Sequence, residues 1–353
     1  MKPRGNRIAW IGVWSVGHNN VRYAELLPRL ANVDRYPVRL HRLRWIRGIQ
    51  RRFLYPCLAI LLRARYPILL CTDPRLVRWF RGRVICDLDD PADVEAEARL
   101  FSRPNVIGVI AASEAIRRRL REAGLRKAVE VIPQGVSLET LDEKKAENIR
   151  RTLRSGSEEV LIGLNQPYAY LGQELHNQRV AAMYAIDDLL RAMEEVQQEV
   201  PRAVLWITGR VSPGVEAYSL RNPWLRLTGY QPHHEILNFV SAFDIGVYPR
   251  SGNALGAASI KILEYMACGV PTVGLAVQEM EVVRESGAGI VAKDWPEFVA
   301  GVLQLVRNAT LRRDLGQRGR AYAQRYSWER LGTAYTELLK RMVEGAPLTP
   351  ASF

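Results

Sequence analysis

The sequence predicts an α/β protein made of two doubly wound domains. Short apolar runs rich in β-branched residues alternate with segments of helical period along nearly all of the 353 residues. This alternation is typical of βαβ units built around parallel sheets. It pauses once, at residues 141–159, where Lys, Arg, Glu and Ser replace any strand signal and a linker or hinge helix fits. We therefore expect two domains, each with its own parallel sheet.

Six strands are expected in the first domain, to which we assign residues 1–150. They are 7–14, 37–42, 68–72, 83–88, 106–111 and 128–132, with helical patterns between them such as 20–30 and 113–123. Residues 1–14 start with basic and apolar residues like a signal peptide, but no small-residue cleavage site follows, so we interpret them as the first strand.

The second domain is assigned to residues 151–326 and repeats the pattern. Its predicted strands are 160–164, 203–208, 225–228, 244–248, 271–274 and 289–292. A closing helix is expected at residues 327–344, and residues 345–353 are expected to be a loose tail. Two facing domains of this kind bind a ligand in a crevice at the carboxyl ends of their strands.

Composition excludes several classes of protein. With 48% hydrophobic and 25% charged residues, the chain is neither disordered nor collagen-like nor a coiled coil. The longest apolar run, residues 53–62, has about half the length that a bilayer-spanning helix needs. The cysteines show no CxxC pairing, which predicts buried free thiols in a reducing compartment and a cytoplasmic location. They are Cys57, Cys71, Cys86 and Cys268.

Positive charge is concentrated in the first third of the chain. The formal net charge is +13, and residues 35–83 alone carry thirteen arginines and one acid. Within this region, segment 45–65 sets arginines beside apolar and aromatic residues, which predicts a helix that rests on an anionic membrane surface. The alternative is a partly buried helix with solvated arginines, and no nucleic-acid-binding motif is present. The candidate patch consists of Trp45, Arg47, Arg51, Arg52 and Phe53.

A candidate anion site follows the predicted strand at residues 244–248. A loop of small residues, 251–258, leads into a helix that opens near Ser259. Small residues let backbone amides approach a ligand, and a helix start favours negative charge. Lys261 and Glu264 are three apart and share one helix face, which suits the diphosphate and the ribose diol of a nucleotide. The alternative is an exposed intrahelical pair worth about 0.3 kcal/mol.

Four segments then resemble the GT-B glycosyltransferases of the large retaining family 4. The resemblance covers nearly the whole chain and is strongest in the second domain. The segments are VIPQGVSLE (131–139), GYQPHHEILNFVSAFDIGVYP (229–249), IKILEYMACGVPTVG (260–274) and YSWERLGTAYTELLKRM (326–342). The resemblance implies a GT-B fold with two Rossmann-like domains facing across a cleft, the acceptor on the first and the donor on the second. It also implies that the closing helix packs back on the first domain.

The resemblance implies donor-binding residues and exposes two departures. Ser259, Lys261 and Glu264 match the family's nucleotide-sugar motif, in which Glu264 would bind the donor ribose. The family's first glutamate would fall at Gly256, so that carboxylate is absent. The two cations that the family places after the first strand of the donor domain are also absent, and Arg179 or Arg210 would have to substitute for them.

Two segments of the first domain are further candidates. Gly17 belongs to a glycine loop that resembles the family's first-domain loop near the donor diphosphate, although an ordinary strand–helix turn fits equally well. Asp89 and Asp90 end the fourth predicted strand and are candidates to orient or deprotonate the acceptor hydroxyl. Their alternative role is to cap the helix that begins near residue 92. The fold requires no metal, and we predict no metal site and no cofactor besides the nucleotide sugar.

Together these features predict a retaining glycosyltransferase of polysaccharide or glycolipid biosynthesis. Lys261 and the helix start would stabilise the departing diphosphate. The expected partners are a nucleotide sugar donor, a lipid-linked or anionic glycan acceptor and an anionic membrane surface at the cytoplasmic face, but no nucleic acid. Because of Gly256 and the absent cations, a non-catalytic module that binds nucleotide sugar or glycan remains the alternative.

Overall fold

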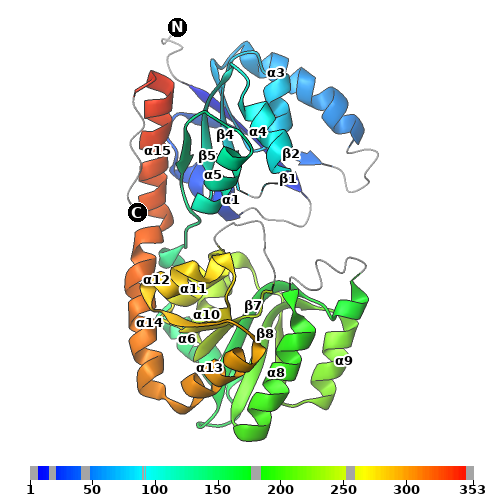
Figure 1. The fold of residues 1–353 in the computed structure, drawn as a ribbon, viewed down its shortest axis with the longest axis vertical. Coiled ribbons are helices and arrows are strands. Elements are labelled where there is room, and N and C mark those ends of the chain that lie inside the picture. Colours follow the sequence, from blue (N-terminus) through cyan, green and yellow to red (C-terminus); the bar gives the residue numbers. More distant parts are fainter. Residues whose placement is uncertain are drawn as a thin grey trace. The chain divides into compact units, whose positions relative to one another are not determined.

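The structure is a computed structural model. It describes residues 7–15, 21–40, 48–89, 91, 93–175, 184–251 and 259–346. These residues form two compact units, each built on a parallel sheet of six strands (Figure 1). The first unit contains the described residues up to Gly135 and from Trp328 onward, and the second contains those from Val136 to Ser327.

The sheet of the first unit has the strand order β2-β1-β3-β4-β5-β6. Neighbouring strands run parallel, and the chain reverses its winding direction between β1 and β3, as in a doubly wound fold. The strands are β1 (Ile8–Ser15), β2 (Val33–Leu40), β3 (Ile68–Cys71), β4 (Arg83–Leu88), β5 (Val106–Ala111) and β6 (Val129–Val131).

Helices cover both faces of this first sheet. Buried residues of α3, α4 and α5 join the strands in one apolar core. On the other face α15 packs against α1 and β5. Gly108 permits this approach, because a Cβ there would lie 2.5 Å from the Met342 sulfur of α15. The bounds are α1 (Val21–Arg29), η1 (Gln50–Leu54), α3 (Tyr55–Arg63), η2 (Pro74–Arg78), α4 (Val94–Phe101), α5 (Glu114–Glu122) and α15 (Trp328–Glu344).

The sheet of the second unit has the order β12-β11-β10-β7-β8-β9. This is the Rossmann order, with the reversal of winding between β7 and β10. The strands are β7 (Val160–Ala169), β8 (Ala203–Val211), β9 (Leu225–Gly229), β10 (Ile245–Tyr248), β11 (Thr272–Leu275) and β12 (Gly289–Ala292). All twelve predicted strands are present, and the predicted fold class is confirmed.

The second sheet is also covered on both faces. Helices α8 and α13 share one apolar core with the strands, whereas α10 and α11 lie in a core on the opposite face. The helices are α6 (Glu143–Leu153), α8 (Ile186–Glu199), α9 (Pro213–Arg221), α10 (Ile236–Ser241), α11 (Ile260–Ala267), α12 (Glu281–Ser286), α13 (Trp295–Arg307) and α14 (Ala309–Ala323). Single turns lie at η3 (Leu138–Thr140), η4 (Gly172–Glu174), η5 (His233–Glu235), η6 (Gln278–Met280) and η7 (Gln324–Tyr326).

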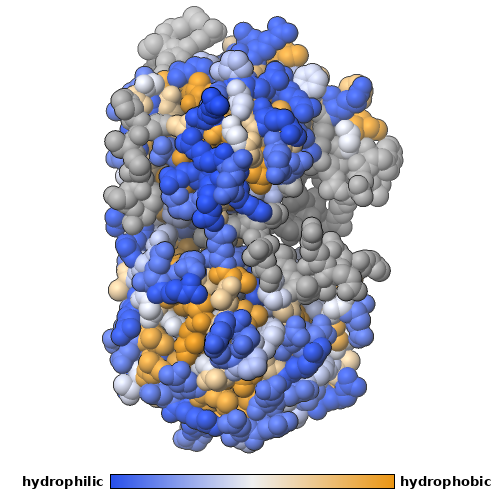
Figure 2. Space-filling view, viewed as in Figure 1, coloured by the Kyte–Doolittle hydropathy of each residue, from blue (hydrophilic) through white to orange (hydrophobic). Residues whose placement is uncertain are grey.

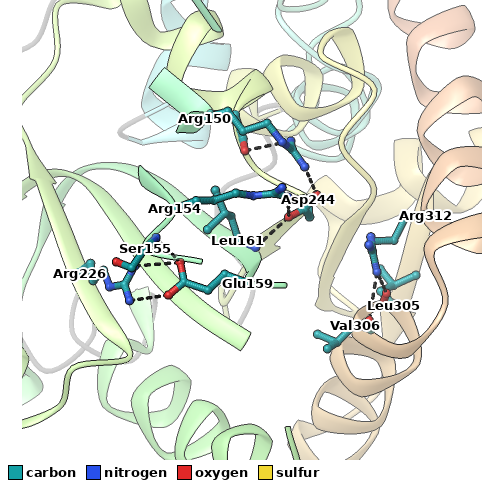
Figure 3. A network of polar contacts seen from close by, with 11 residues as sticks. Arg150, Arg154, Ser155, Glu159, Leu161, Arg226, Asp244, Leu305, Val306 and Arg312 are labelled. Carbon is teal, nitrogen blue, oxygen red and sulfur yellow. Dashed lines mark hydrogen bonds and ion pairs between the residues drawn. The ribbon is translucent and has the colours of Figure 1, made fainter. Parts of the chain in front are cut away.

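Helix α6 belongs to the second unit, so the change of unit at residues 135/136 comes earlier than the boundary at residue 150 that the sequence pattern gave. Asp244, which directly precedes β10, anchors this region (Figure 3). Its carboxylate pairs with Arg150 of α6 and with Arg154, the latter at 3.1 Å, and accepts a bond from the Leu161 amide at 2.9 Å. Part of the charged segment for which a linker or hinge helix was predicted thus forms a helix fixed to the second sheet.

Three of the four cysteines, Cys71, Cys86 and Cys268, are buried free thiols as predicted. Cys57 is exposed, so the prediction for Cys57 was wrong. Cys57 lies on α3, whose buried side is occupied by Tyr55, Ala59 and Leu62. Within the described ranges, no helix combines the length and the apolar character needed to cross a bilayer.

Candidate functional site

The candidate site lies at the carboxyl edge of the second sheet, beside the reversal point between β7 and β10. Ligands of doubly wound folds bind outside the strand ends at this kind of point. Asn165 lies within β7, level with the carboxyl end of the neighbouring strand β10, and α11 follows β10 in the chain. Gly269 ends α11 with φ of 69°, and the amides of Gly269 and Val270 bond back to Met266 and Tyr265 in a Schellman arrangement.

Glu264 is buried on α11, with only 3% of its surface exposed. Its Oε2 accepts a 2.6 Å hydrogen bond from Asn165 Nδ2, and its Oε1 lies 3.7 Å from Nδ1 of His233. Burial raises the pKa of Glu264 to about 8, although the Lys261 charge and the Asn165 bond act in the opposite direction. The alternative of an exposed Lys–Glu pair is therefore wrong for Glu264.

Lys261 and Ser259 lie at the start of α11. Ser259 is the N-cap residue, yet its side chain does not cap the helix, and the first turn contains no acid. The positive end of the helix dipole is therefore not neutralised by side chains of α11 itself. Burial and the neighbouring charge of Arg250 together lower the pKa of Lys261 to about 8. Two cations and a helix start thus form an electropositive corner.

Arg250 is a functional candidate that sequence reasoning missed. It follows β10 by two residues, and its side chain is 21% exposed. Its Nη1 donates a 3.0 Å hydrogen bond to Glu279 Oε1, and its guanidinium lies 5.4 Å from the ring centroid of Tyr184. The signal was present in the sequence as a cation at the carboxyl end of a predicted strand, next to the loop that leads to Ser259.

Tyr265 fixes α11 against β7. Its hydroxyl donates to the Gly163 carbonyl at 2.9 Å and accepts from the Asn165 amide at 2.7 Å. Gly246 of β10 leaves room for the ring, because a Cβ there would lie 2.6 Å from Tyr265 Cδ1. The backbone that carries Glu264 is therefore held in place by the sheet, as a precise ligand site requires.

Arg210, the cation proposed from sequence, lies near the end of β8 among aromatic rings. Its guanidinium is 4.8 Å from the ring centroid of Tyr230 and 5.8 Å from that of Tyr168. Gly209 precedes it with φ of 138°, and a Cβ at that position would lie 1.7 Å from the Gln166 carbonyl oxygen. Arg210 thus has aromatic partners, whereas Arg250 is the arginine that acts on Lys261. Arg179, the other proposed substitute, lies outside the described residues.

The first unit presents carboxylates where β4 ends. Asp89 accepts a hydrogen bond from Gln134 Nε2. Asp87 accepts one from Tyr335 of α15 at 2.7 Å and pairs with the buried Arg22 at 3.4 Å. The N-cap of α4 is Asp93, so the capping alternative is wrong for Asp89. Asp90 and Gly17 lie outside the described residues.

The described residues form no cluster of three or more His, Cys, Asp or Glu side chains that could hold a metal ion.

The candidate patch is partly described. Residues 48–54 are helical, with a π-turn at Gln50–Leu54, and continue into α3. Three large apolar side chains are exposed: Phe53 at 63%, Ile60 at 68% and Leu61 at 66%. Arg52 is exposed in the same segment, and Figure 2 shows hydrophobic and hydrophilic surface close together there. Trp45, Arg47 and the side chain of Arg51 lie outside the described residues.

The fold is the one seen in GT-B glycosyltransferase structures. HepE of Anabaena, solved in complex with UDP, superposes with a TM-score of 0.74 at 13% identity, covering 95% of this chain and 100% of that one. WaaG, a glycosyltransferase of lipopolysaccharide biosynthesis, superposes with a TM-score of 0.70 at 11% identity, covering 94% and 99%.

Sequence comparison gives partial matches. Residues 177–308 match the family described as Glycosyl transferases group 1. The chain is 33% identical over 114 residues to the O-antigen chain mannosyltransferase B of Escherichia coli, which is 32% of this chain and 29% of that protein. It is 25% identical over 234 residues to the D-inositol 3-phosphate glycosyltransferase of Segniliparus rotundus, a match that covers 63% of this chain and 49% of that protein. The matches thus span less than half the length of either relative.

Proposed function

We propose that the protein transfers a sugar from a nucleotide diphosphate sugar to an acceptor hydroxyl, with retention of configuration. The observation that carries this proposal is Glu264. It is a buried carboxylate with a raised pKa, fixed by Asn165 and placed one helical turn from Lys261 at the reversal point of a Rossmann sheet. A carboxylate at such a site accepts hydrogen bonds from ribose hydroxyls.

In this mechanism the second unit binds the donor and stabilises the leaving group. The diphosphate takes up negative charge as the bond to the sugar breaks. Lys261, Arg250 and the amides at the start of α11 would receive that charge without reorganising, which is the usual source of electrostatic catalysis. The family resemblance predicts cations just after β7, but the sequence has neither Arg nor Lys there. Arg250 would supply the missing positive charge.

The first unit would bind the acceptor, which we propose to be a lipid-linked or anionic glycan. Asp89, oriented by Gln134, would accept a hydrogen bond from the acceptor hydroxyl and orient it or take its proton. Asp90 remains a second candidate for this role. Replacing Asp89 by Asn should lower kcat while leaving the affinity for the donor unchanged.

Turnover is tested with purified protein and a panel of UDP, GDP, ADP and dTDP sugars, by measuring release of the nucleoside diphosphate. We expect release from at least one donor and a KM for that donor that is at least ten-fold higher for Glu264→Gln. A KM unchanged in that variant would remove Glu264 from the donor site. Binding of a nucleotide sugar without release, on every acceptor tried, would favour the alternative of a non-catalytic binding module.

We propose further that the protein binds the cytoplasmic face of an anionic membrane through the surface around Phe53. Exposed Phe53, Ile60 and Leu61 would enter the interface, while Arg52 and the neighbouring arginines would contact lipid phosphates, each for about 1 kcal/mol. Vesicle flotation tests this idea. Vesicles with anionic lipid should carry the protein, neutral vesicles should not, and the double variant Phe53→Ser with Ile60→Ser should float less. Equal flotation with both vesicle types would contradict the proposal.

A further inference from the structure

Oε2 of Glu279 is a buried polar atom near Arg250 that has no hydrogen-bond partner among the described residues. Glu279 is 3% exposed, and its other carboxylate oxygen accepts the bond from Arg250. The hydroxyl of Tyr248, a residue that is 4% exposed, lies within hydrogen-bonding reach of Arg250 and Ser259. A buried polar atom without a partner is costly, and a bound ligand is one way to complete its bonding.

The topology places these atoms on one side of the electropositive corner. Glu279 lies in η6, directly after β11, and Tyr248 ends β10. Glu264 with its partner Asn165 belongs to the β7 side, because the strand order is β11-β10-β7. Two carboxylates therefore flank the cations Arg250 and Lys261, along an edge that spans two strand spacings, or about 10 Å.

This arrangement matches a ligand with a hydroxylated group at each end and a diphosphate between them. A carboxylate oxygen needs a hydrogen-bond donor, which a diphosphate cannot supply at neutral pH but a sugar hydroxyl can. Glu264 has Asn165 and His233 around it and is the ribose candidate. Glu279 stands on the opposite side of the cations, where the second hydroxylated group of a nucleotide sugar would lie.

We propose that Glu279, held by Arg250, binds hydroxyl groups of the transferred sugar and so determines which sugar the enzyme accepts. Tyr248 supports it with a second hydrogen-bonding group. This inference rests on the proposed donor site. Gly256 stands where the family's first glutamate would fall, and in this proposal Glu279 supplies a carboxylate for the donor from a different element of the fold.

The test compares a nucleotide with its sugar conjugate by isothermal titration calorimetry. UDP with UDP-glucose and GDP with GDP-mannose serve as probe pairs for wild type, Glu279→Gln and Glu264→Gln. The glutamine at 279 keeps an oxygen that can accept the Arg250 bond. We expect Glu279→Gln to bind the nucleotide alone as wild type does and to lose ten-fold or more in affinity for the conjugate. Glu264→Gln should weaken both ligands.

Three outcomes would overturn the proposal. Equal losses for nucleotide and conjugate in Glu279→Gln would mean that Glu279 only braces Arg250, and Glu279→Asp, which keeps the charge, would then restore both affinities together. No loss for either ligand would remove Glu279 from the site. If wild type bound no member of either pair, the proposed donor site itself would fail. That failure is distinguishable from a failure of the Glu279 proposal, because it is seen in wild type and not only in the Glu279 variants. Melting temperatures of all variants verify that they are folded.

Discussion

Replacing Glu264 by glutamine is expected to remove a pH dependence from the folding stability of the free protein. Burial raises the pKa of Glu264 to about 8, whereas the unfolded chain releases that proton near pH 4.5. Between these values the folded state holds a proton that the unfolded state has lost. The free energy of unfolding that Glu264 contributes is therefore fully present below pH 4.5 and falls as the pH rises to 8. At 1.36 kcal/mol per pKa unit, the fall from pH 5 to pH 8 is at most about 4 kcal/mol.

The measured change should be smaller, about 1–3 kcal/mol, because relaxation of the folded protein and penetration of water reduce the cost of a buried charge. Urea denaturation of wild type and Glu264→Gln at pH 5, 6, 7 and 8 gives the free energy of unfolding, and the difference between the two proteins isolates Glu264. Measurements stop at pH 8 because Lys261, with its lowered pKa, adds stability as the pH rises above that value. Glu147→Gln, an exposed carboxylate on α6, is the matched control.

A difference between wild type and Glu264→Gln that stays constant across these four pH values would refute the reasoning. It would mean that the carboxylate is as well solvated in the folded protein as in the unfolded chain. The site would then lack the dry environment that makes its charges effective toward a diphosphate.

Two further predictions concern the framework around the two candidate sites. Asp244→Ala should cost about 3 kcal/mol in urea denaturation, because it leaves two half-buried arginines without their carboxylate, whereas Glu158→Gln, at an exposed pair, should cost less than about 0.5 kcal/mol. Tyr335→Phe should lower the free energy of unfolding of the first unit, measured by thermal denaturation, by about 1–3 kcal/mol, since the buried Asp87 loses a 2.7 Å hydrogen bond. Unchanged melting in that variant would mean that the bond does not hold α15.

Local signals in the sequence were sufficient for the architecture and for part of the site. Periodicity located all twelve strands, because buried parallel strands are short apolar runs that stand out between helices. The helix that carries Glu264 could be bounded from sequence as well, since Gly269 and Pro271 end it and the small-residue loop precedes it. The three-residue spacing placed Lys261 and Glu264 on one face, but spacing alone could not tell a buried carboxylate from an exposed one.

Contacts between distant segments were not readable in the same way. Glu279 meets Arg250 only because β10 and β11 are neighbours in the sheet, and nothing in the local pattern of either residue indicates the other. The charged composition of residues 141–159 predicted a linker or hinge helix, but the pairing with Asp244 that fixes its helix to the second unit was not readable. Cys57 lies in an apolar run but points outward, since exposure depends on which face of α3 packs.

The most direct test of the donor site is calorimetric binding of nucleoside diphosphates to wild type and Lys261→Met. The account predicts that at least one of UDP, GDP, ADP and dTDP binds wild type, and that the variant, which keeps the length of the side chain without its charge, binds it at least ten-fold more weakly. Wild-type protein that binds none of the four, or a variant that binds as tightly as wild type, would contradict it.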